Sequence, residues 1–204
     1  MRFDATRPNR PAGLLALFLL ILSAGSVFGE AGVTLPPGTP SFKAPVFVTT
    51  CGQSPGALMV KVLCRQAKVD CIQGDLMTAD ELAAKAKSGG TLFVTTGTSG
   101  KGMGAAGIDV GGEVKRCQQL MKRARELGMR VIVGQIEGTS RRSDESDEQS
   151  IRAMSPLADL LITRTEVNGD GYFTRVAQEK NIPQIFIEQT LDLGRILPAL
   201  VAAK

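Results

Sequence analysis

A glycine-rich stretch from Thr95 to Gly107 combines five glycines with small hydroxyl side chains and one lysine, Lys101. It follows an apolar run at 91–94 that is typical of a buried strand. Glycines allow backbone N–H groups to converge on a ligand, and Lys101 adds a positive charge. These groups bind phosphates and carboxylates, so the stretch predicts an anion site without identifying the ligand.

A second turn, Cys51–Gly56, is expected to lie beside the first. It follows a strand predicted at 46–50, and in a flavodoxin-like sheet this strand neighbours the one at 91–96, where the strand order reverses. Ligands of such sheets bind at that point. Ser54 is also placed to cap the next helix, whose N-terminus favours anions. The alternative is that the glycines only form tight turns.

A third loop, 137–144, follows the fourth predicted strand and contains two adjacent arginines. Arginines bind carboxylates or phosphates through paired hydrogen bonds. The alternative is a solvated loop whose arginines pair with nearby acidic residues. The complete predicted ligand-binding set is Gln53, Ser54, Thr98, Ser99, Gly100, Lys101, Arg141 and Arg142.

Several known catalytic and cofactor motifs are excluded. The chain has no histidine, which rules out Ser-His-Asp and Cys-His catalysis and imidazole metal sites. The G-x-G-x-x-G pattern from Gly102 to Gly107 starts too far beyond its strand for a dinucleotide site, and a glycine follows Lys101 where a Walker motif needs Ser or Thr. Residues 168–171 begin like a calcium loop, but Phe173 stands where an EF-hand requires glycine. We predict no catalytic residue, no metal and no cofactor.

Strand and helix signals alternate over residues 44–204. Capping boxes at 78–81 and 146–149 indicate two helix starts, a long helix is expected over 112–127, and Asp170 is expected to cap a helix from about 171. Continuous apolar strands that alternate with helices predict a single three-layer, doubly wound α/β domain of flavodoxin- or Rossmann-like type. Its mainly parallel sheet should have five to six strands, drawn from 46–50, 69–73, 91–96, 130–136, 159–163 and 184–187.

Residues 1–29 are predicted to be a secretory signal peptide. A basic start precedes the apolar run Leu14–Leu22, which is too short to span a bilayer, and the small residues Val27 and Gly29 suit a cleavage site. Because no cysteine follows the run and no arginine pair precedes it, we expect the general secretory route and a periplasmic or extracellular location. The alternative is an uncleaved N-terminal anchor. Residues 30–43 are predicted to form an extended leader.

Composition limits the partners. The formal net charge is only +4, Trp is absent and there is one Tyr, so a nucleic-acid partner is not expected. No later segment is long and apolar enough to span a bilayer, so no stable membrane insertion is expected after signal cleavage.

In an exported protein four cysteines permit two disulfides in three connectivities. Cys117 is expected in the core, and a Cys64–Cys71 bridge is conceivable, but geometry decides.

Four segments resemble corresponding parts of a single family: Cys51–Lys61, Ser99–Asp109, Arg141–Asp144 and Asn168–Phe173. The family is an uncharacterised one of small exported bacterial α/β proteins, and the resemblance covers nearly all of the predicted mature chain. It implies export and a single domain. It adds no catalytic residue, because the family's domain has no established activity.

Three functions remain open. The first is an exported binding module for a small anionic ligand at the C-terminal edge of the sheet. The second is a histidine-independent hydrolase or transferase in the same crevice, which would use Asp109, Asp144 or Cys51. The third is an interaction module that docks on a membrane or surface partner. Because no nucleophile–base pair is recognisable, the sequence favours binding over catalysis.

Overall fold

The computed structural model describes residue 1 and residues 35–201, and these residues contain a sheet of six strands. All neighbouring strands are parallel, in the order β2-β1-β3-β4-β5-β6. The strand order therefore reverses between β1 and β3, as predicted. The strands are β1 (Val46–Cys51), β2 (Cys71–Gln73), β3 (Thr91–Thr96), β4 (Arg130–Gln135), β5 (Leu160–Arg164) and β6 (Gln184–Ile187).

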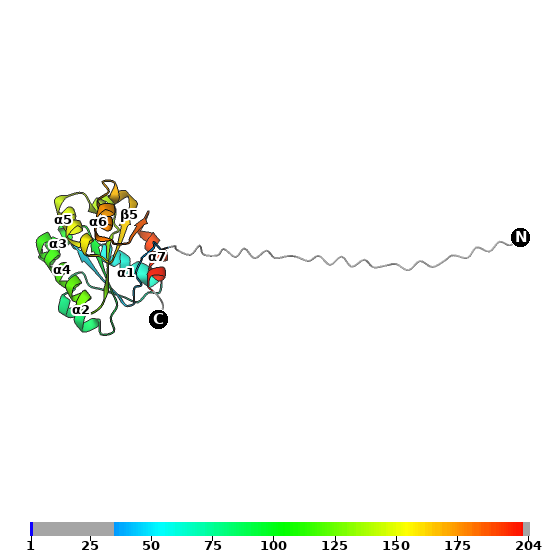
Figure 1. Cartoon of the computed structure of the whole chain (residues 1–204), viewed down its shortest axis with the longest axis horizontal. Helices are drawn as coiled ribbons and strands as arrows, with labels where there is room; N and C mark the ends of the chain where they lie inside the picture. The colour runs from blue at the N-terminus through cyan, green and yellow to red at the C-terminus, as the bar shows by residue number, and fades with distance from the viewer. Residues whose placement is uncertain (2–34, 202–204) are drawn as a thin grey trace. The chain divides into compact units, whose positions relative to one another are not determined.

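Helices cover both faces of the sheet (Figure 1). The crossover from β1 to β2 runs in the opposite direction along the sheet from the later ones, so its helix lies on one face and the helices that follow β2, β3, β4 and β5 lie on the other. The helix that follows β6, the last strand, packs on the first face. The first face carries α1 (Gly56–Gln66) and α7 (Leu193–Leu200). The second carries α2 (Ala79–Lys85), α4 (Val110–Glu126), α5 (Glu145–Met154) and α6 (Tyr172–Lys180). The predicted three-layer, doubly wound α/β fold is confirmed.

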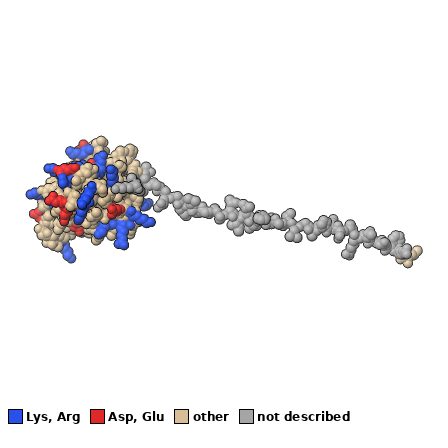
Figure 2. Space-filling view, turned by 90° about the horizontal axis from the view of Figure 1, so that it is seen from below, with Lys and Arg blue, Asp and Glu red and all other residues tan. Residues whose placement is uncertain are grey.

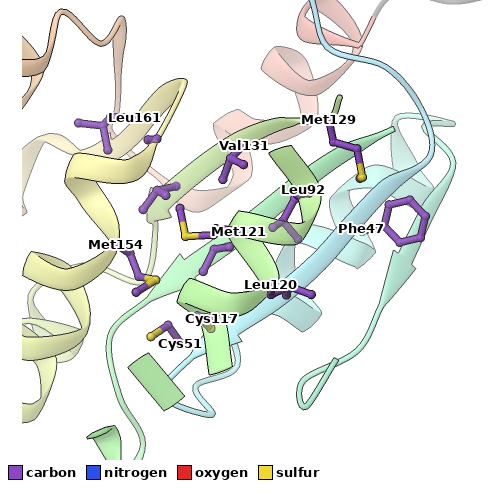
Figure 3. Packing of buried hydrophobic residues seen from close by; sticks show 14 of the residues in the cluster. Phe47, Cys51, Leu92, Cys117, Leu120, Met121, Met129, Val131, Met154 and Leu161 are labelled. Atoms are coloured by element: carbon purple, nitrogen blue, oxygen red, sulfur yellow. The ribbon is translucent and has the colours of Figure 1, made fainter. Parts of the chain in front are cut away.

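An apolar cluster lies on each face of the sheet. Alternate residues of a strand point to opposite faces, so Phe47 and Cys51 of β1 join the cluster under α4, and Val46 and Val48 join the cluster under α1 and α7. Figure 3 shows the first cluster, in which Leu120 of α4 lies over the strands. All six residues of β1 are buried, which explains the absence of polar alternation along this strand.

The glycine-rich stretch is more ordered than predicted, because most of it forms α3 (Gly100–Ala106). The Ser99 hydroxyl caps this helix by accepting a hydrogen bond from the Gly102 N–H at 3.2 Å. Gly107 ends it in a left-handed conformation, with the Ile108 N–H bonded to the Met103 carbonyl. Consequently the loop at the end of β3 is only three residues long.

Three other helix starts differ from the predictions. The Asp109 carboxylate caps α4, which begins two residues earlier than expected. Asp144, not Ser146, caps α5, because its carboxylate accepts the Asp147 N–H at 2.9 Å. At α6, Asp170 accepts the Tyr172 N–H, but the capping position itself is occupied by a left-handed glycine. Each shift moves a boundary and leaves the helix in place.

The end of the predicted leader is part of the folded domain. Phe42 is buried, and its N–H donates to the Leu200 carbonyl at 3.2 Å. This contact places residue 42 next to the C-terminal helix, so the domain begins before residue 44. Residues 2–29 of the predicted signal peptide and residues 30–34 of the leader lie outside the described residues. Within the described part, no helix has both the length and the hydropathy to cross a bilayer.

Candidate functional site

The loops that follow β1 and β3 lie directly against each other. Gln53 and Thr98 form an antiparallel bridge, and the Ser99 N–H donates to the Gly52 carbonyl at 2.8 Å. The approach is so close that a side chain at Gly102 would collide with the backbone of Gln53. The structure thus brings these predicted site residues together, with backbone contacts filling the space between the two loops.

The N-terminus of α1 holds a carboxylate of the protein itself. Contrary to the prediction, Ser54 does not cap this helix; its hydroxyl donates to Oε1 of Glu137 at 2.5 Å. The same carboxylate lies against the first residue of α1, where a Cβ at Gly56 would come within 2.6 Å of Oε1, and Nε of Arg141 lies 3.5 Å from Oε2. The side chain of Glu137 is only 4% exposed. Burial raises its pKa above the ordinary value, although Ser54 and Arg141 act in the opposite direction.

Two predicted basic side chains remain open to solvent near this cluster. Arg141 is 31% exposed and donates from Nη1 to the Thr98 carbonyl at 2.9 Å. Gly97 permits this approach, since a Cβ there would lie 2.6 Å from the Cβ of Arg141. Lys101 is exposed on the first turn of α3, three residues beyond Thr98. Both cations therefore lie on the same loop region at the carboxyl edge of the sheet.

Arg142 points to a different part of the molecule. It donates to Glu148 at 2.7 Å, to both carboxylate oxygens of Asp170, and to the Val167 carbonyl. Its guanidinium also lies 5.2 Å from the centre of the Phe173 ring. It links α5 to the start of α6, so the structure separates it from the other predicted ligand-binding residues. This matches the alternative in which the arginines pair with nearby acids.

Sequence reasoning missed two further buried carboxylates at this edge. Glu113 is completely buried and accepts the Gly52 N–H at 2.8 Å. Asp147 accepts the N–H groups of Thr98 and Ser143 at 2.7 and 2.9 Å. Burial acts to raise the pKa of Asp147, but these hydrogen bonds outweigh it and the pKa is lowered. Glu113 had a signal in the sequence, because it precedes Cys117 by one turn on the apolar face of α4.

The three residues of the enzymatic alternative have structural partners. Asp109 and Asp144 cap α4 and α5, and Cys51 is fully buried beside Cys117. No group of three His, Cys, Asp or Glu side chains in the described chain is arranged to hold a metal ion.

A hollow of about 420 Å³ lies between α1 and the 3₁₀ turn at Thr190–Asp192. Large apolar side chains next to it are open to solvent: Leu58 is 52% exposed, Val62 47% and Leu191 69%. Met59 completes this set at 37%. We call these four residues the α1 face.

A second hollow, of about 610 Å³, lies on the other side of Leu58 and Val62, toward β2. Its lining includes three cations, Lys61, Arg65 and Lys68, and one acid, Asp70. Figure 2 shows Lys and Arg side chains gathered in places on the surface in that view. The α1 face therefore has an apolar hollow on one side and a basic hollow on the other. Sequence reasoning missed this surface.

Comparison with solved structures gives only distant likenesses. A truncated 3-deoxy-D-arabino-heptulosonate 7-phosphate synthase from Thermotoga maritima is 12% identical over 85% of this chain, with a TM-score of 0.32. The chain spans about half, 52%, of that protein's structure. The psychrotrophic esterase EstA from Pseudoalteromonas sp. is 9% identical over 69% of this chain and 76% of its own, with a TM-score of 0.30. Likenesses of this size carry no functional argument.

No curated protein matches the chain. Residues 43–201 match DUF6305, a domain of unknown function. This range contains all six strands and all the helices of the described structure. The predicted resemblance to an uncharacterised family is confirmed, and the chain belongs to the DUF6305 family.

Proposed function

We propose that the chain is a protein-binding module whose α1 face receives an acidic, amphipathic helix of a partner protein. The observation that carries this proposal is the exposure of four large apolar side chains around one hollow. Single exposed apolar residues are ordinary, but a contiguous group beside a cavity is typical of an interaction site.

The charges beside the α1 face favour an acidic partner. Lys61 and Arg65 lie on α1 itself, and Lys68 follows its end, so three cations are opposed by Asp70 alone within that hollow. A partner helix with leucines along one stripe could fill the apolar hollow, with its acids reaching the basic one. A second copy of this chain is disfavoured, because two such faces would bring like charges together.

We further propose that the chain is exported by the general secretory route and meets its partner in the periplasm or outside the cell. Support comes from the basic start, the short apolar run and the small residues of 1–29.

The test uses a fluorescent synthetic helix with leucines at helical spacing and glutamates beside them, and measures its anisotropy with the folded protein. We expect saturable binding, and Leu58→Glu with Val62→Glu should weaken it at least about 10-fold, since each buried apolar side chain contributes roughly 1.5–3 kcal/mol. The matched control is Leu76→Glu, which changes an equally exposed leucine outside the α1 face.

A lysine version of the peptide and vesicles of anionic lipid distinguish the other occupants. The double variant Lys61→Glu and Arg65→Glu should bind the acidic peptide more weakly than wild type and the lysine version more tightly. Equal binding by wild type and the Leu58/Val62 variant would contradict the proposal. Preferential binding to vesicles, or dimerisation lost on Leu58→Glu, would also contradict it and would assign the α1 face to lipid or to a second copy.

Binding of a small anion is a second candidate, favoured by one specific observation. The Ser54 hydroxyl and Arg141 converge on one carboxylate, that of Glu137, at the start of α1. These are the groups that would bind an external phosphate or carboxylate, and Lys101 is exposed on the first turn of α3, at the same edge of the sheet. Glu137 opposes such a ligand by its charge and occupies the inner position.

Inorganic phosphate is the probe for this candidate. We expect Glu137→Gln to bind phosphate more tightly than wild type, because the variant removes a competing charge, and Lys101→Ala to bind it less tightly. Lys87→Ala, at an exposed lysine after α2, serves as the control. Binding is read from the rise in melting temperature that phosphate causes. If phosphate changed the melting temperature of neither wild type nor Glu137→Gln, the anion-site proposal would be contradicted.

A further inference from the structure

The four cysteines fall into two pairs, and one pair lies in the cluster under α4. Cys51, at the end of β1, and Cys117 are both completely buried there. Figure 3 shows their side chains next to each other. The Cys117 thiol also donates to the carbonyl of Thr50, the residue before Cys51, at 3.6 Å. The two side chains are thus neighbours in the core, and each thiol shifts the pKa of the other, that of Cys51 downward and that of Cys117 upward.

The other pair lies on the opposite face of the sheet. Cys64 is buried on α1, and Cys71 is the first residue of β2. The turn between them is tight, with the Val69 N–H bonded to the Cys64 carbonyl at 2.8 Å. Each of these thiols likewise shifts the pKa of the other, that of Cys64 upward and that of Cys71 downward. Cys71 is half-buried and lines the basic hollow, so a reagent in solvent can reach it.

The sheet separates the two pairs. We infer that the chain carries two intramolecular disulfides, Cys51–Cys117 and Cys64–Cys71, formed when it meets an oxidising disulfide, either a small molecule or a disulfide-exchange protein. The other two connectivities would join thiols that lie on opposite faces of the packed sheet, beyond the reach of a disulfide. Tertiary structure thereby selects one of the three pairings that four cysteines allow.

The chemistry is thiol–disulfide exchange. The Cys71 thiolate attacks one sulfur of the oxidising disulfide, which forms a mixed disulfide and releases one thiol. The Cys64 thiolate then attacks the Cys71 sulfur, closing the Cys64–Cys71 bond and releasing the second thiol. The oxidant gains two electrons, and the two cysteine protons end on the released thiols. The hydrogen bond from Cys64, and then the charge of Lys61, lower the pKa of Cys71, which suits it to the first attack.

Closure of the first pair has a different timing. Cys51 and Cys117 are completely buried once α4 packs, so an oxidant reaches them only during folding. This predicts that oxidation of the folded, reduced protein closes Cys64–Cys71 alone. Refolding in the presence of the oxidant closes both bonds.

The test starts from unfolded, reduced full-length protein that is refolded with oxidised and reduced glutathione. Free thiols are then alkylated, and the non-reduced tryptic peptides are identified by mass. We expect one linked pair that contains Cys51 and Cys117 and another that contains Cys64 and Cys71, which trypsin separates at Arg65 and Lys68. Cys64→Ser should free Cys71 for alkylation and leave the Cys51–Cys117 link intact.

Thermal melting gives an independent readout. The oxidised protein should melt several degrees above the same protein treated with dithiothreitol, because both bonds restrict the unfolded chain. Four alkylated cysteines after oxidative refolding would overturn the inference, and so would a linked peptide that joins Cys51 or Cys117 to Cys64 or Cys71. None of these outcomes depends on whether the α1 face binds a helix.

Discussion

Three buried carboxylates hold the loops at the carboxyl edge of the sheet. Glu113 binds the loop after β1, Asp147 binds the loop after β3, and Glu137 binds the start of α1. Glu113 and Asp147 accept backbone N–H groups of these loops, and Glu137 accepts the Ser54 hydroxyl. Each of these three bonds joins residues 49 or more positions apart. The loops predicted to bind a ligand are therefore fixed by internal acids.

Removal of Glu113 should destabilise the fold strongly. Its carboxylate is 0% exposed and pairs with Arg116 at 2.9 Å, so Glu113→Ala would leave a buried cation without its partner. We expect a loss of about 3–5 kcal/mol in the free energy of unfolding, measured with urea. The matched control is Glu126→Ala, which breaks an exposed pair with Arg123 on the same helix and should cost less than about 1 kcal/mol. Equal losses would contradict the assigned role.

Glu137 should make stability depend on pH in a defined direction. Its folded pKa is raised above the ordinary 4.5, so its contribution to stability is fully present below that pH and is lost as the pH rises through the folded pKa. We therefore expect Glu137→Gln to gain stability relative to wild type as the pH increases from about 4.5 toward neutrality. Urea unfolding across this range measures the difference. Parallel curves for the two proteins would contradict it.

At the scale of secondary-structure elements, the predicted strands all exist, and errors concentrate where glycine and capping residues compete. Apolar runs such as 91–96 were predictable because burial on both faces leaves no polar alternation. The glycines of 100–107 suggested a loop, yet the Ser99 cap and the Gly107 stop stabilise α3 between them. The helix starts near 110 and 145 depend on which of several neighbouring residues caps the helix, and the sequence alone does not rank these candidates.

The cap of α4 should be worth a measurable part of the stability. The Asp109 carboxylate accepts the Gly112 N–H at 2.7 Å, so Asp109→Ala should reduce the free energy of unfolding by about 1 kcal/mol. Asp109→Asn keeps an oxygen acceptor and should retain most of it. If urea unfolding showed Asp109→Asn to be as destabilised as Asp109→Ala, loss of the cap would not explain the loss of stability.

At the scale of the whole molecule, the two faces of the sheet are covered unequally. Six strands about 4.8 Å apart make a sheet wider than two helices of about 10 Å, and α1 and α7 are the helices on that face among the described residues. Four helices cover the other face. α7 packs against α1 on this face, and no further helix among the described residues covers the side of α1 toward β2, where the basic hollow lies.

Export remains a prediction at this scale, and it has a direct measurement. We expect the secreted protein to begin at Glu30, because Val27 and Gly29 suit the peptidase site. Intact mass of the protein recovered from the periplasm or medium checks this. A species that retains Leu14–Leu22 would support the uncleaved anchor instead.

The sequence leaves the strand order open between flavodoxin-like and Rossmann-like types, and the structure has the flavodoxin-like order at β1 and β3. The fold class and the edge at which Gln53, Ser54 and Thr98 lie are predictable from the sequence. These follow from apolar periodicity and turn residues, which act over a few neighbouring positions. The partners of those residues, the grouping of the four cysteines on the two faces of the sheet and the exposure of the α1 face are visible in the folded structure alone. Such contacts join residues far apart in the chain, and local patterns carry no information about which distant groups meet.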